Sequence, residues 1–391
     1  MNPVLAHRMM ITLVAGEASG DQLGAALIRA VRVHHPDAHF NGIGGPLMQA
    51  EGMDCWWDCS ELSVMGLFEV IRHIPRLVKL RRQLLERVLE QQPDVYIGID
   101  APDFNLGVEK RLKQRSIAVI HYVSPTVWAW RPGRVKTIAR ATERVLCLFP
   151  FEPRYYRDQP VLTDYTGHPM ADLIPLRNDA ATARQTLGIT SNGLIIALLP
   201  GSRMGEVEKL TTPMLEAAQI LANKYPDVHF IVPAASTAIK GYLATELRKY
   251  PAVRCQLFDN RGKAVMAAAD VVVCASGTAT LEVLLVNRPM VVCYRLAAST
   301  YALVKTFNLI KSRFFALPNI LASEQLVPEL LQQEVTGERI AHEVSRWLEE
   351  PQSREALSKR FDQLHRELRT DAAATAANAV LQHLSQKPGP P

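Results

Sequence analysis

Apolar residues in the first half of the chain form short runs, and the segments between the runs carry apolar residues at helical spacing. The runs predict strands at Met10–Ala15, His39–Ile43, Val95–Ile99, Ala118–Tyr122, Arg144–Leu148 and Asp164–Tyr165. The intervening segments predict helices at Gly20–His34, Pro75–Gln91, Asn105–Arg115 and Pro132–Ala141. Buried strands that alternate with helices are typical of a parallel sheet covered on both faces, which is an α/β fold.

The second half repeats the pattern, with predicted strands at Leu194–Leu199, Val228–Val232, Arg254–Leu257, Val271–Cys274 and Met290–Tyr294. Because 391 residues are many for one core, we expect two doubly wound domains, residues 1–172 and 173–351, with a cleft between them. The helical tail from Glu334 to Gln386 is expected to cap the second domain, and its helices within residues 352–386 are expected to pack back on the first. Residues 387–391 read as a disordered tail.

Composition adds few constraints. The chain is 48% hydrophobic and 21% charged with a net charge of +5, which suits an anionic partner without requiring nucleic acid. The apolar stretch Met9–Ala15 is too short to span a membrane and lacks a signal-peptide layout, so we expect a cytosolic protein. The six cysteines are scattered and complete no zinc site, and no metal-binding motif occurs, so we expect buried thiols and no metal cofactor.

The strongest signal for chemistry is Pro200-Gly-Ser-Arg203, which joins the strand ending at Leu199 to a segment of helical spacing. Ligands of open α/β sheets bind beyond the carboxyl ends of strands, and helix N-termini offer free N–H groups to anions. Arg203 is therefore well placed to meet a phosphate. Since the unit lies mid-chain, it also predicts that a second α/β domain begins just before it.

A second strand-to-helix turn has the same character. The residues Ser276-Gly277-Thr278 follow the predicted strand Val271–Cys274, and Glu282 lies one turn into the next helix, where it could accept ribose hydroxyls. A simple capped helix would also explain these residues. With Arg203 in the same domain, a diphosphate is the simplest common ligand.

The first domain offers two acidic strand tips. Glu17 and Ser19 lie in a small-residue turn after the first strand, which lacks the glycine spacing of a dinucleotide fingerprint. Asp100 directly follows the strand Val95–Ile99, where a carboxylate can serve as a general base. Nearby Asp103 reads better as the cap of the following helix.

Two tryptophans, Trp128 and Trp130, follow another strand tip in a proline-bearing loop. Large aromatic side chains near a strand tip either pack in the core or bind a ligand. Two interpretations therefore remain: core packing, and the wall of a pocket for sugar rings or acyl chains.

Taken together, the motifs resemble those of the lipid-A-disaccharide synthases, from about residue 10 to about residue 384. The motifs that carry the resemblance are Ala15-Gly-Glu-Ala-Ser-Gly-Asp21, Gly98-Ile-Asp-Ala-Pro-Asp-Phe-Asn105, His121-Tyr-Val-Ser-Pro-Thr-Val-Trp-Ala-Trp130, Leu199-Pro-Gly-Ser-Arg203, Ala275-Ser-Gly-Thr-Ala279 and Leu317-Pro-Asn319. One local departure is Met204-Gly205, where some relatives carry smaller residues, and it leaves Arg203 intact.

The resemblance implies an inverting, metal-independent glycosyltransferase of family 19 with the GT-B fold. Such enzymes join UDP-2,3-diacylglucosamine to 2,3-diacylglucosamine 1-phosphate, giving a β-1,6-linked disaccharide and UDP for the lipopolysaccharide of Gram-negative bacteria. They are peripheral membrane proteins on the inner face of the inner membrane. Whether the chain forms a homodimer is left open.

The resemblance also assigns residue roles. It implies that Asp100 is the general base, that Arg203 lies near the diphosphate, and that Glu17 and Ser19 are functional. Its remaining matches are a UDP site and a cleft position, at Ser276, Gly277, Thr278, Glu282 and Asn319. Two rival functions remain: a UDP-sugar epimerase of the same fold, and a non-catalytic protein that binds UDP-sugar or lipid.

One segment fits a membrane surface. An apolar stretch that includes Met65, Leu67 and Phe68 precedes a basic run that contains Arg76, Lys79, Arg81 and Arg82. We hypothesise that the apolar residues insert into an anionic membrane while the basic residues hold lipid headgroups. An ordinary covering helix with a solvated basic side is the alternative.

Overall fold

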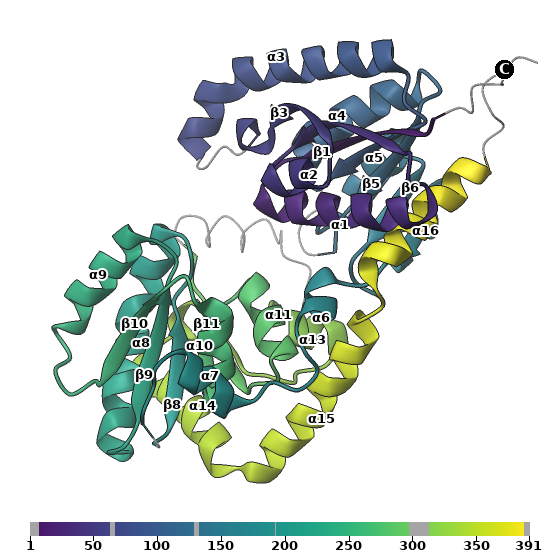
Figure 1. Ribbon diagram of the computed structural model, residues 1–391. Helices are drawn as coiled ribbons and strands as arrows, with labels where there is room; N and C mark the ends of the chain where they lie inside the picture. The colour runs from purple at the N-terminus through teal and green to yellow at the C-terminus, as the bar shows by residue number, and fades with distance from the viewer. Residues whose placement is uncertain (1–7, 63–66, 129–132, 192, 297–312, 387–391) are drawn as a thin grey trace, which may run out of the picture. The chain divides into compact units, whose positions relative to one another are not determined.

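The computed structural model describes residues 8–62, 67–128, 133–191, 193–296 and 313–386, with the backbone alone for residues 67–73. The chain divides into two compact units (Figure 1). The first unit comprises residues 1–169 and 369–391, and the second comprises residues 170–368. Each unit is a parallel sheet with helices, so the predicted α/β fold class is confirmed.

The sheet of the first unit has the order β3-β2-β1-β4-β5-β6-β7, and every pairing is parallel. Its strands are β1 (Met10–Ala15), β2 (His39–Gly44), β3 (Asp54–Asp58), β4 (Val95–Ile99), β5 (Ala118–Tyr122), β6 (Arg144–Cys147) and β7 (Leu162–Tyr165). Its helices are α1 (Ala18–His34), α2 (Pro46–Ala50), α3 (Leu67–Gln91), α4 (Pro102–Lys113), α5 (Arg134–Ala141) and α16 (Ala372–Ser385).

Alternation along the central strands divides the core of this unit into two faces. Leu13 and Ile97 belong to the cluster that also contains side chains of α1 and α16. Val14 and Tyr96 belong to the cluster that contains side chains of α3 and α4. In Figure 1 the yellow helix α16 runs beside α1, so the last helix of the chain completes the core built by the first.

The sheet of the second unit has the order β10-β9-β8-β11-β12-β13, again entirely parallel. Its strands are β8 (Ile195–Leu199), β9 (His229–Ala234), β10 (Cys255–Asp259), β11 (Val271–Ala275), β12 (Met290–Tyr294) and β13 (Glu329–Leu331). Its helices are α6 (Pro169–Leu173), α7 (Ala180–Thr186), α8 (Met204–Lys224), α9 (Thr237–Leu247), α10 (Gly262–Ala268), α11 (Thr278–Leu285), α13 (Leu317–Ala322), α14 (Gly337–Glu349) and α15 (Pro351–Leu368).

Both sheets reverse their strand order at one place. In the first unit the reversal lies between β1 and β4, and in the second it lies between β8 and β11. Ligands of doubly wound folds bind beyond the carboxyl ends of the strands at such a switch point. The fold therefore singles out one sheet edge in each unit as the place to look for chemistry.

The C-terminal helices divide differently from the expectation for residues 352–386. Helix α15 packs within the second unit, where Asn287 Nδ2 donates to Asp362 Oδ1 at 2.7 Å. Of these helices only α16 lies in the first unit. Just before α16, Thr370 Oγ1 donates to the carbonyl oxygen of Thr166 at 2.6 Å. Among the described residues, none of the helices combines the length and apolar character that a membrane crossing needs.

Candidate functional site

At the first switch point the loops after β1 and β4 lie against each other. A Cβ added to Gly16 would stand 2.6 Å from the Cβ of Ala101, so only glycine allows this approach. Asp100 and Ala101 both adopt left-handed backbone conformations, with φ of 51° and 44°. Strained backbone of this kind clusters at functional sites, because the surrounding structure has to hold it. Asp100 and Glu17 are thereby brought to one sheet edge.

Hydrogen bonds fix the backbone of Asp100 on both sides. Its N–H donates to the carbonyl oxygen of Tyr122 at 2.8 Å, and its carbonyl oxygen accepts from Asn105 Nδ2 at 2.9 Å. The side chain is half-buried, and burial raises the pKa of its carboxyl group. Positive charge on His121 acts in the opposite direction, while the nearby Glu17 raises this pKa further. A carboxyl group with a raised pKa at a strand tip fits a general base.

Behind Asp100 lies a buried pair that sequence reasoning missed. Glu109 of α4 and His121 of β5 are both 0% exposed, and Nδ1 of the ring lies 2.7 Å from Oε1 of the carboxyl group. His121 begins a motif that carries the family resemblance, but it stands within a predicted strand and Glu109 within a predicted helix, so neither was assigned a role. A charged residue among the mostly apolar buried positions of this helix was a further sign.

The other predicted residues of the first unit are more exposed. Ser19 Oγ donates to Glu17 Oε1 at 2.7 Å, so these two side chains form a small polar group at the tip of β1. Asp103 does not cap α4, because Ala101 occupies the cap position, and Asp103 instead pairs with Arg134.

The predicted aromatic pair is only partly described. Trp128 packs edge-on against Phe151 with ring centroids 5.5 Å apart, which supports the packing interpretation of this residue. Trp130 lies outside the described residues.

At the second switch point two glycine turns stand side by side. Strands β8 and β11 are neighbours, with Leu199 paired to Cys274, so the turns that follow them share one sheet edge. Gly201 and Gly277 have φ of 125° and 148°, which side-chain-bearing residues rarely adopt. Each turn leads directly into a helix, α8 or α11. Free N–H groups of two helix starts therefore meet at one edge, as an anion site requires.

Arg203 occupies the cap position of α8 with its side chain 77% exposed. Its nearest acid is Glu206, at a loose 3.6 Å, so the guanidinium keeps donors for a ligand. Gly277 and Thr278 are exposed, and Ser276 is half-buried.

Glu282 lies one turn into α11, and burial raises the pKa of its carboxyl group, while Lys263 acts to lower it. It thus lies on the helix that the Ser276–Thr278 turn begins, as the sequence predicted.

Asn319 has a structural place that the sequence did not indicate. Its side chain is 0% exposed, Nδ2 donates to Val327 O and Glu329 Oε1, and Oδ1 accepts from the N–H groups of Leu326 and Val327. These four bonds use the donors and acceptors of the amide, so none is left for a ligand.

The segment before α13 explains why Asn319 matters. Glu329, held by Asn319, accepts from the N–H groups of Phe315 and Ala316, and Ser276 Oγ donates to the carbonyl oxygen of Phe315 at 3.1 Å. The ring of Phe315 stacks on Tyr294 with centroids 5.9 Å apart. Asn319 thus organises a segment that closes on the second switch point.

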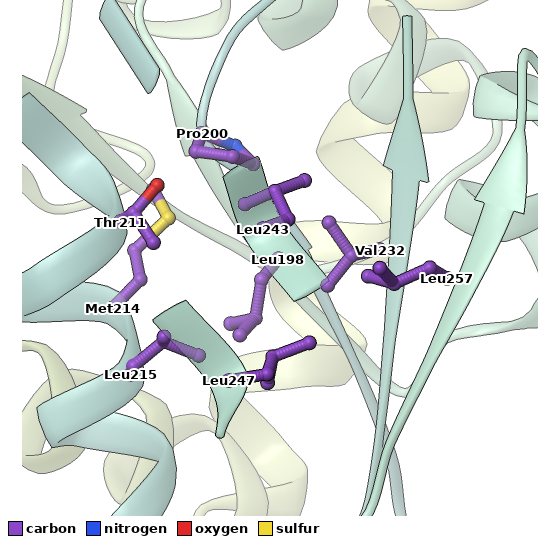
Figure 2. A pocket seen from close by; sticks show the side chains of 9 residues that line it. All are labelled: Leu198, Pro200, Thr211, Met214, Leu215, Val232, Leu243, Leu247 and Leu257. Atoms are coloured by element: carbon purple, nitrogen blue, oxygen red, sulfur yellow. The ribbon is translucent and has the colours of Figure 1, made fainter. Parts of the chain in front are cut away.

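An apolar pocket in the second unit is not a candidate site. Figure 2 shows its nine lining side chains, which come from the sheet, from the turn after β8 and from α8 and α9. Its volume of about 10 Å³ is near that of a single water, and Thr211 Oγ1 is already bonded to Val207 O at 2.6 Å. A sugar or an acyl chain does not fit there.

The basic segment lies on α3, whose Leu84 and Val88 are buried in the core. Arg76 pairs with Glu61 at 2.8 Å, and Arg81 donates to the carbonyl oxygen of Asp103 at 2.8 Å. Met65 lies outside the described residues, as do the side chains of Leu67 and Phe68. Within the part of the chain that the structure describes, no group of three or more His, Cys, Asp or Glu side chains could hold a metal ion.

Comparisons with known proteins agree with the motifs. The family model of lipid-A-disaccharide synthetases matches residues 11–380. A lipid-A-disaccharide synthase of Xanthomonas campestris pv. campestris is 50% identical over 379 residues, which cover 96% of this chain and 86% of that protein. One of Xylella fastidiosa is 49% identical over 379 residues, which cover 96% of this chain and 98% of that protein.

Two solved structures share the fold. A putative UDP-N-acetylglucosamine 2-epimerase from Listeria monocytogenes matches with a TM-score of 0.65 and 11% identity, covering 98% of both chains. The MurG protein of Acinetobacter baumannii matches with a TM-score of 0.57 and 12% identity, covering 96% of this chain and 99% of that one. At such low identity these likenesses show the fold alone, two Rossmann-like domains of the GT-B type.

Proposed function

The chain belongs to the lipid-A-disaccharide synthetase family and is a glycosyltransferase of lipid A biosynthesis, and we propose that it joins UDP-2,3-diacylglucosamine to 2,3-diacylglucosamine 1-phosphate. The observation that carries the residue roles is the location of the predicted residues at the two switch points. The first unit offers a carboxylate, and the second offers a cation beside two helix starts.

In the proposed reaction Asp100 takes the proton of the acceptor 6-hydroxyl as that oxygen attacks the anomeric carbon of the donor. The new carbon–oxygen bond forms with inversion while the bond to the UDP oxygen breaks, and UDP leaves with the negative charge. The hydroxyl of Ser276 already donates to the carbonyl oxygen of Phe315, so Arg203, Thr278 and the N-terminus of α11 would stabilise this charge. Their shared sheet edge supports the role, because donors fixed before the reaction need no reorganisation.

The experiment incubates the protein with both acylated substrates and analyses the products. A disaccharide with stoichiometric UDP supports the proposal, whereas an isomeric UDP-sugar would reveal an epimerase. Binding of UDP without turnover would indicate a non-catalytic protein.

Replacing the base separates its role from binding. We expect Asp100→Ala to lower kcat by about 10²–10⁴-fold, the usual contribution of a general base, with little change in UDP affinity. Full turnover in a folded Asp100→Ala protein would remove Asp100 from the mechanism.

Membrane association is a further part of this proposal. On α3 the side chains of Ile74 and Val78 are 47% and 57% exposed, and Lys79 and Arg82 are exposed beside them. Arg76 and Arg81 have partners within the protein at 2.8 Å, whereas Arg82 pairs only loosely with Glu86 at 3.7 Å. Lys79 and Arg82 would therefore hold most of the anionic headgroups. Both proposed substrates carry acyl chains, which supports a location at a membrane, and the family resemblance adds the inner face of the inner membrane.

A further inference from the structure

The buried pair of Glu109 and His121 lies beside the proposed base. Both side chains are 0% exposed, and the ring Nδ1 lies 2.7 Å from Glu109 Oε1. Taking charges out of water costs several kcal/mol per ion, and a buried ion pair is often no more stable than apolar side chains of the same volume. Stability alone is therefore a poor reason for this pair.

The neighbouring strand makes room for the pair. Gly98 of β4 is in register with His121 of β5, two residues before Asp100. A Cβ at Gly98 would lie 2.2 Å from Glu109 Oε1 and 2.9 Å from the Cβ of Asn105. Contacts that short do not occur, so the pair can lie beside the Asp100 strand tip only because this residue is a glycine.

Two atoms of the pair have no hydrogen-bond partner in the described structure: Nε2 of His121 and Oε2 of Glu109. Buried polar groups without partners are rare, and each costs free energy. The charge of the ring nevertheless acts outside the pair, because His121 and Asp100 influence each other electrostatically.

Charged groups from three parts of the fold influence the protonation of the His121 ring. Burial lowers the pKa of the ring, but Glu109 of α4 and Asp100 after β4 outweigh it, and Arg134 of α5 opposes them. The net effect raises the pKa of His121 above its usual value, which favours the charged form of the ring. The same charge lowers the pKa of Asp100, against burial and Glu17, which raise it.

We propose that His121, held by Glu109, is a positioning residue whose positive charge keeps the Asp100 carboxylate ionised and ready to accept the proton of the acceptor hydroxyl. The inference rests on the proposed role of Asp100 as base. Glu109 keeps His121 protonated in a site where burial would otherwise neutralise it. Neither side chain touches substrate, so the pair acts through Asp100.

The test compares pH profiles of kcat/KM for the wild type, His121→Gln and Glu109→Gln. Without the positive charge, Asp100 holds its proton to higher pH, so the acid limb of the profile moves upward. We expect a displacement of about one pH unit, so that activity falls about tenfold at pH values below the wild-type midpoint and stays near the wild-type level at about pH 8.5. UDP affinity should not change, and Glu109→Asp should restore part of the acid limb.

A matched control exists in the same unit. His383 Nε2 lies 2.9 Å from Glu143 Oε2, a second largely buried histidine–glutamate pair, on α16 and before β6. His383→Gln should leave the acid limb at the wild-type position, even if it lowers the melting temperature. A purely structural role of His121 would lower the rate by one factor at every pH, and that result overturns the proposal.

A second measurement needs neither turnover nor a stable variant. Imidazole ¹⁵N NMR of the wild-type protein should find His121 protonated at pH 7, and a neutral ring would contradict the proposal. If Asp100→Ala keeps full activity while His121 is charged, the role of Asp100 fails and the pair is only structural. If Asp100→Ala is inactive and the acid limb of folded His121→Gln is unmoved, the pair alone is excluded.

Discussion

Gly98 controls the geometry of the first switch point at the scale of one residue. It lies in β4 with no side chain, and the space that a side chain would fill is occupied by Glu109 and Asn105. Asn105 in turn donates to the carbonyl oxygen of Asp100. A single added methyl group therefore disturbs both neighbours of the proposed base.

We expect Gly98→Ala to destabilise the first unit by about 1–3 kcal/mol, the usual cost of overpacking a dense core. Activity should fall more than stability explains, because Asn105 and Glu109 must both move. Thermal unfolding and steady-state kinetics measure the two effects. The control is Gly241→Ala in α9, where an added Cβ meets nothing within 4 Å, and it should instead raise stability.

Arg203 offers a test of the second switch point. Its guanidinium is exposed and only loosely paired, so removing it costs little folding energy. A lost hydrogen bond to a charged group is worth about 1.5–3 kcal/mol, so UDP affinity should fall by about 10–100-fold in Arg203→Ala. Isothermal titration with UDP checks this, with Arg248→Ala, exposed after α9, as control. Equal affinity in wild type and Arg203→Ala would exclude the assignment.

Sequence reasoning found residues whose role depends on local position. Asp100 directly follows β4, and Arg203 ends the short turn after β8. A strand tip can be located from an apolar run. His121 and Glu109 were not identified, because their role comes from a contact between α4 and β5. That contact uses the space that Gly98 leaves by having no side chain. Asn319 matched a family motif, but only its bonds to Glu329 and Val327 reveal that it organises a segment.

Among the elements, α3 departs most from its prediction. The sequence predicts a helix at Pro75–Gln91, but the helix begins at Leu67 and includes Pro75. Its buried side faces the core through Leu84 and Val88. Ile74, Val78 and Arg82 recur at four-residue intervals and so line one exposed side.

This exposed side predicts the response of vesicle binding to substitution. Each cation near an anionic surface contributes about 1 kcal/mol, so replacing Lys79 and Arg82 by Gln should weaken binding to phosphatidylglycerol vesicles by about 30-fold. Ile74→Ser with Val78→Ser should weaken it further. Co-sedimentation with anionic and zwitterionic vesicles measures both effects.

Arg81→Gln is the control for this prediction. Arg81 donates to Asp103 O and lies over the Phe104 ring, 5.1 Å from its centroid. This variant should lower stability and leave vesicle binding nearly intact. Unchanged binding when Arg76, Lys79, Arg81 and Arg82 are all neutralised would refute the docking hypothesis.

Two edge strands were not predicted. The β3 segment reads Asp-Cys-Trp-Trp-Asp and is polar at both ends, while β13 has three residues. An edge strand pairs on one side and is covered less, so it needs no continuous apolar run. The central strands β1, β4, β8 and β11 are buried on both faces and were predicted because burial demands such runs.

At the scale of the whole molecule, the first unit is built from both ends of the chain. Ala376, Ala377 and Val380 of α16 belong to the same buried cluster as Leu27 and Ile28 of α1. His383 adds a polar contact to Glu143. The predicted return of the C-terminus therefore concerns one helix rather than the whole of 352–386.

Removing that helix should affect the two units unequally. A chain that ends at Leu368 loses the apolar side chains that cover α1, so we expect its first unit to unfold at lower temperature and its glycosyl transfer to vanish. The second unit keeps all its residues and should still bind UDP. Calorimetry and UDP titration measure these outcomes, and a chain that ends at Gln386 should match the wild type.

Helix α16 also has a consequence during synthesis. When the ribosome has completed β7, the apolar surface of α1 is still uncovered, and the 199 residues from Met170 to Leu368 must be added before the covering helix emerges. At bacterial translation speeds this takes on the order of 10–40 s. Over that interval the apolar side chains of α1 that α16 covers stay uncovered. The second unit is continuous in the chain and can fold as soon as it leaves the exit tunnel. The part of the enzyme that is made first is thus the part that is finished last.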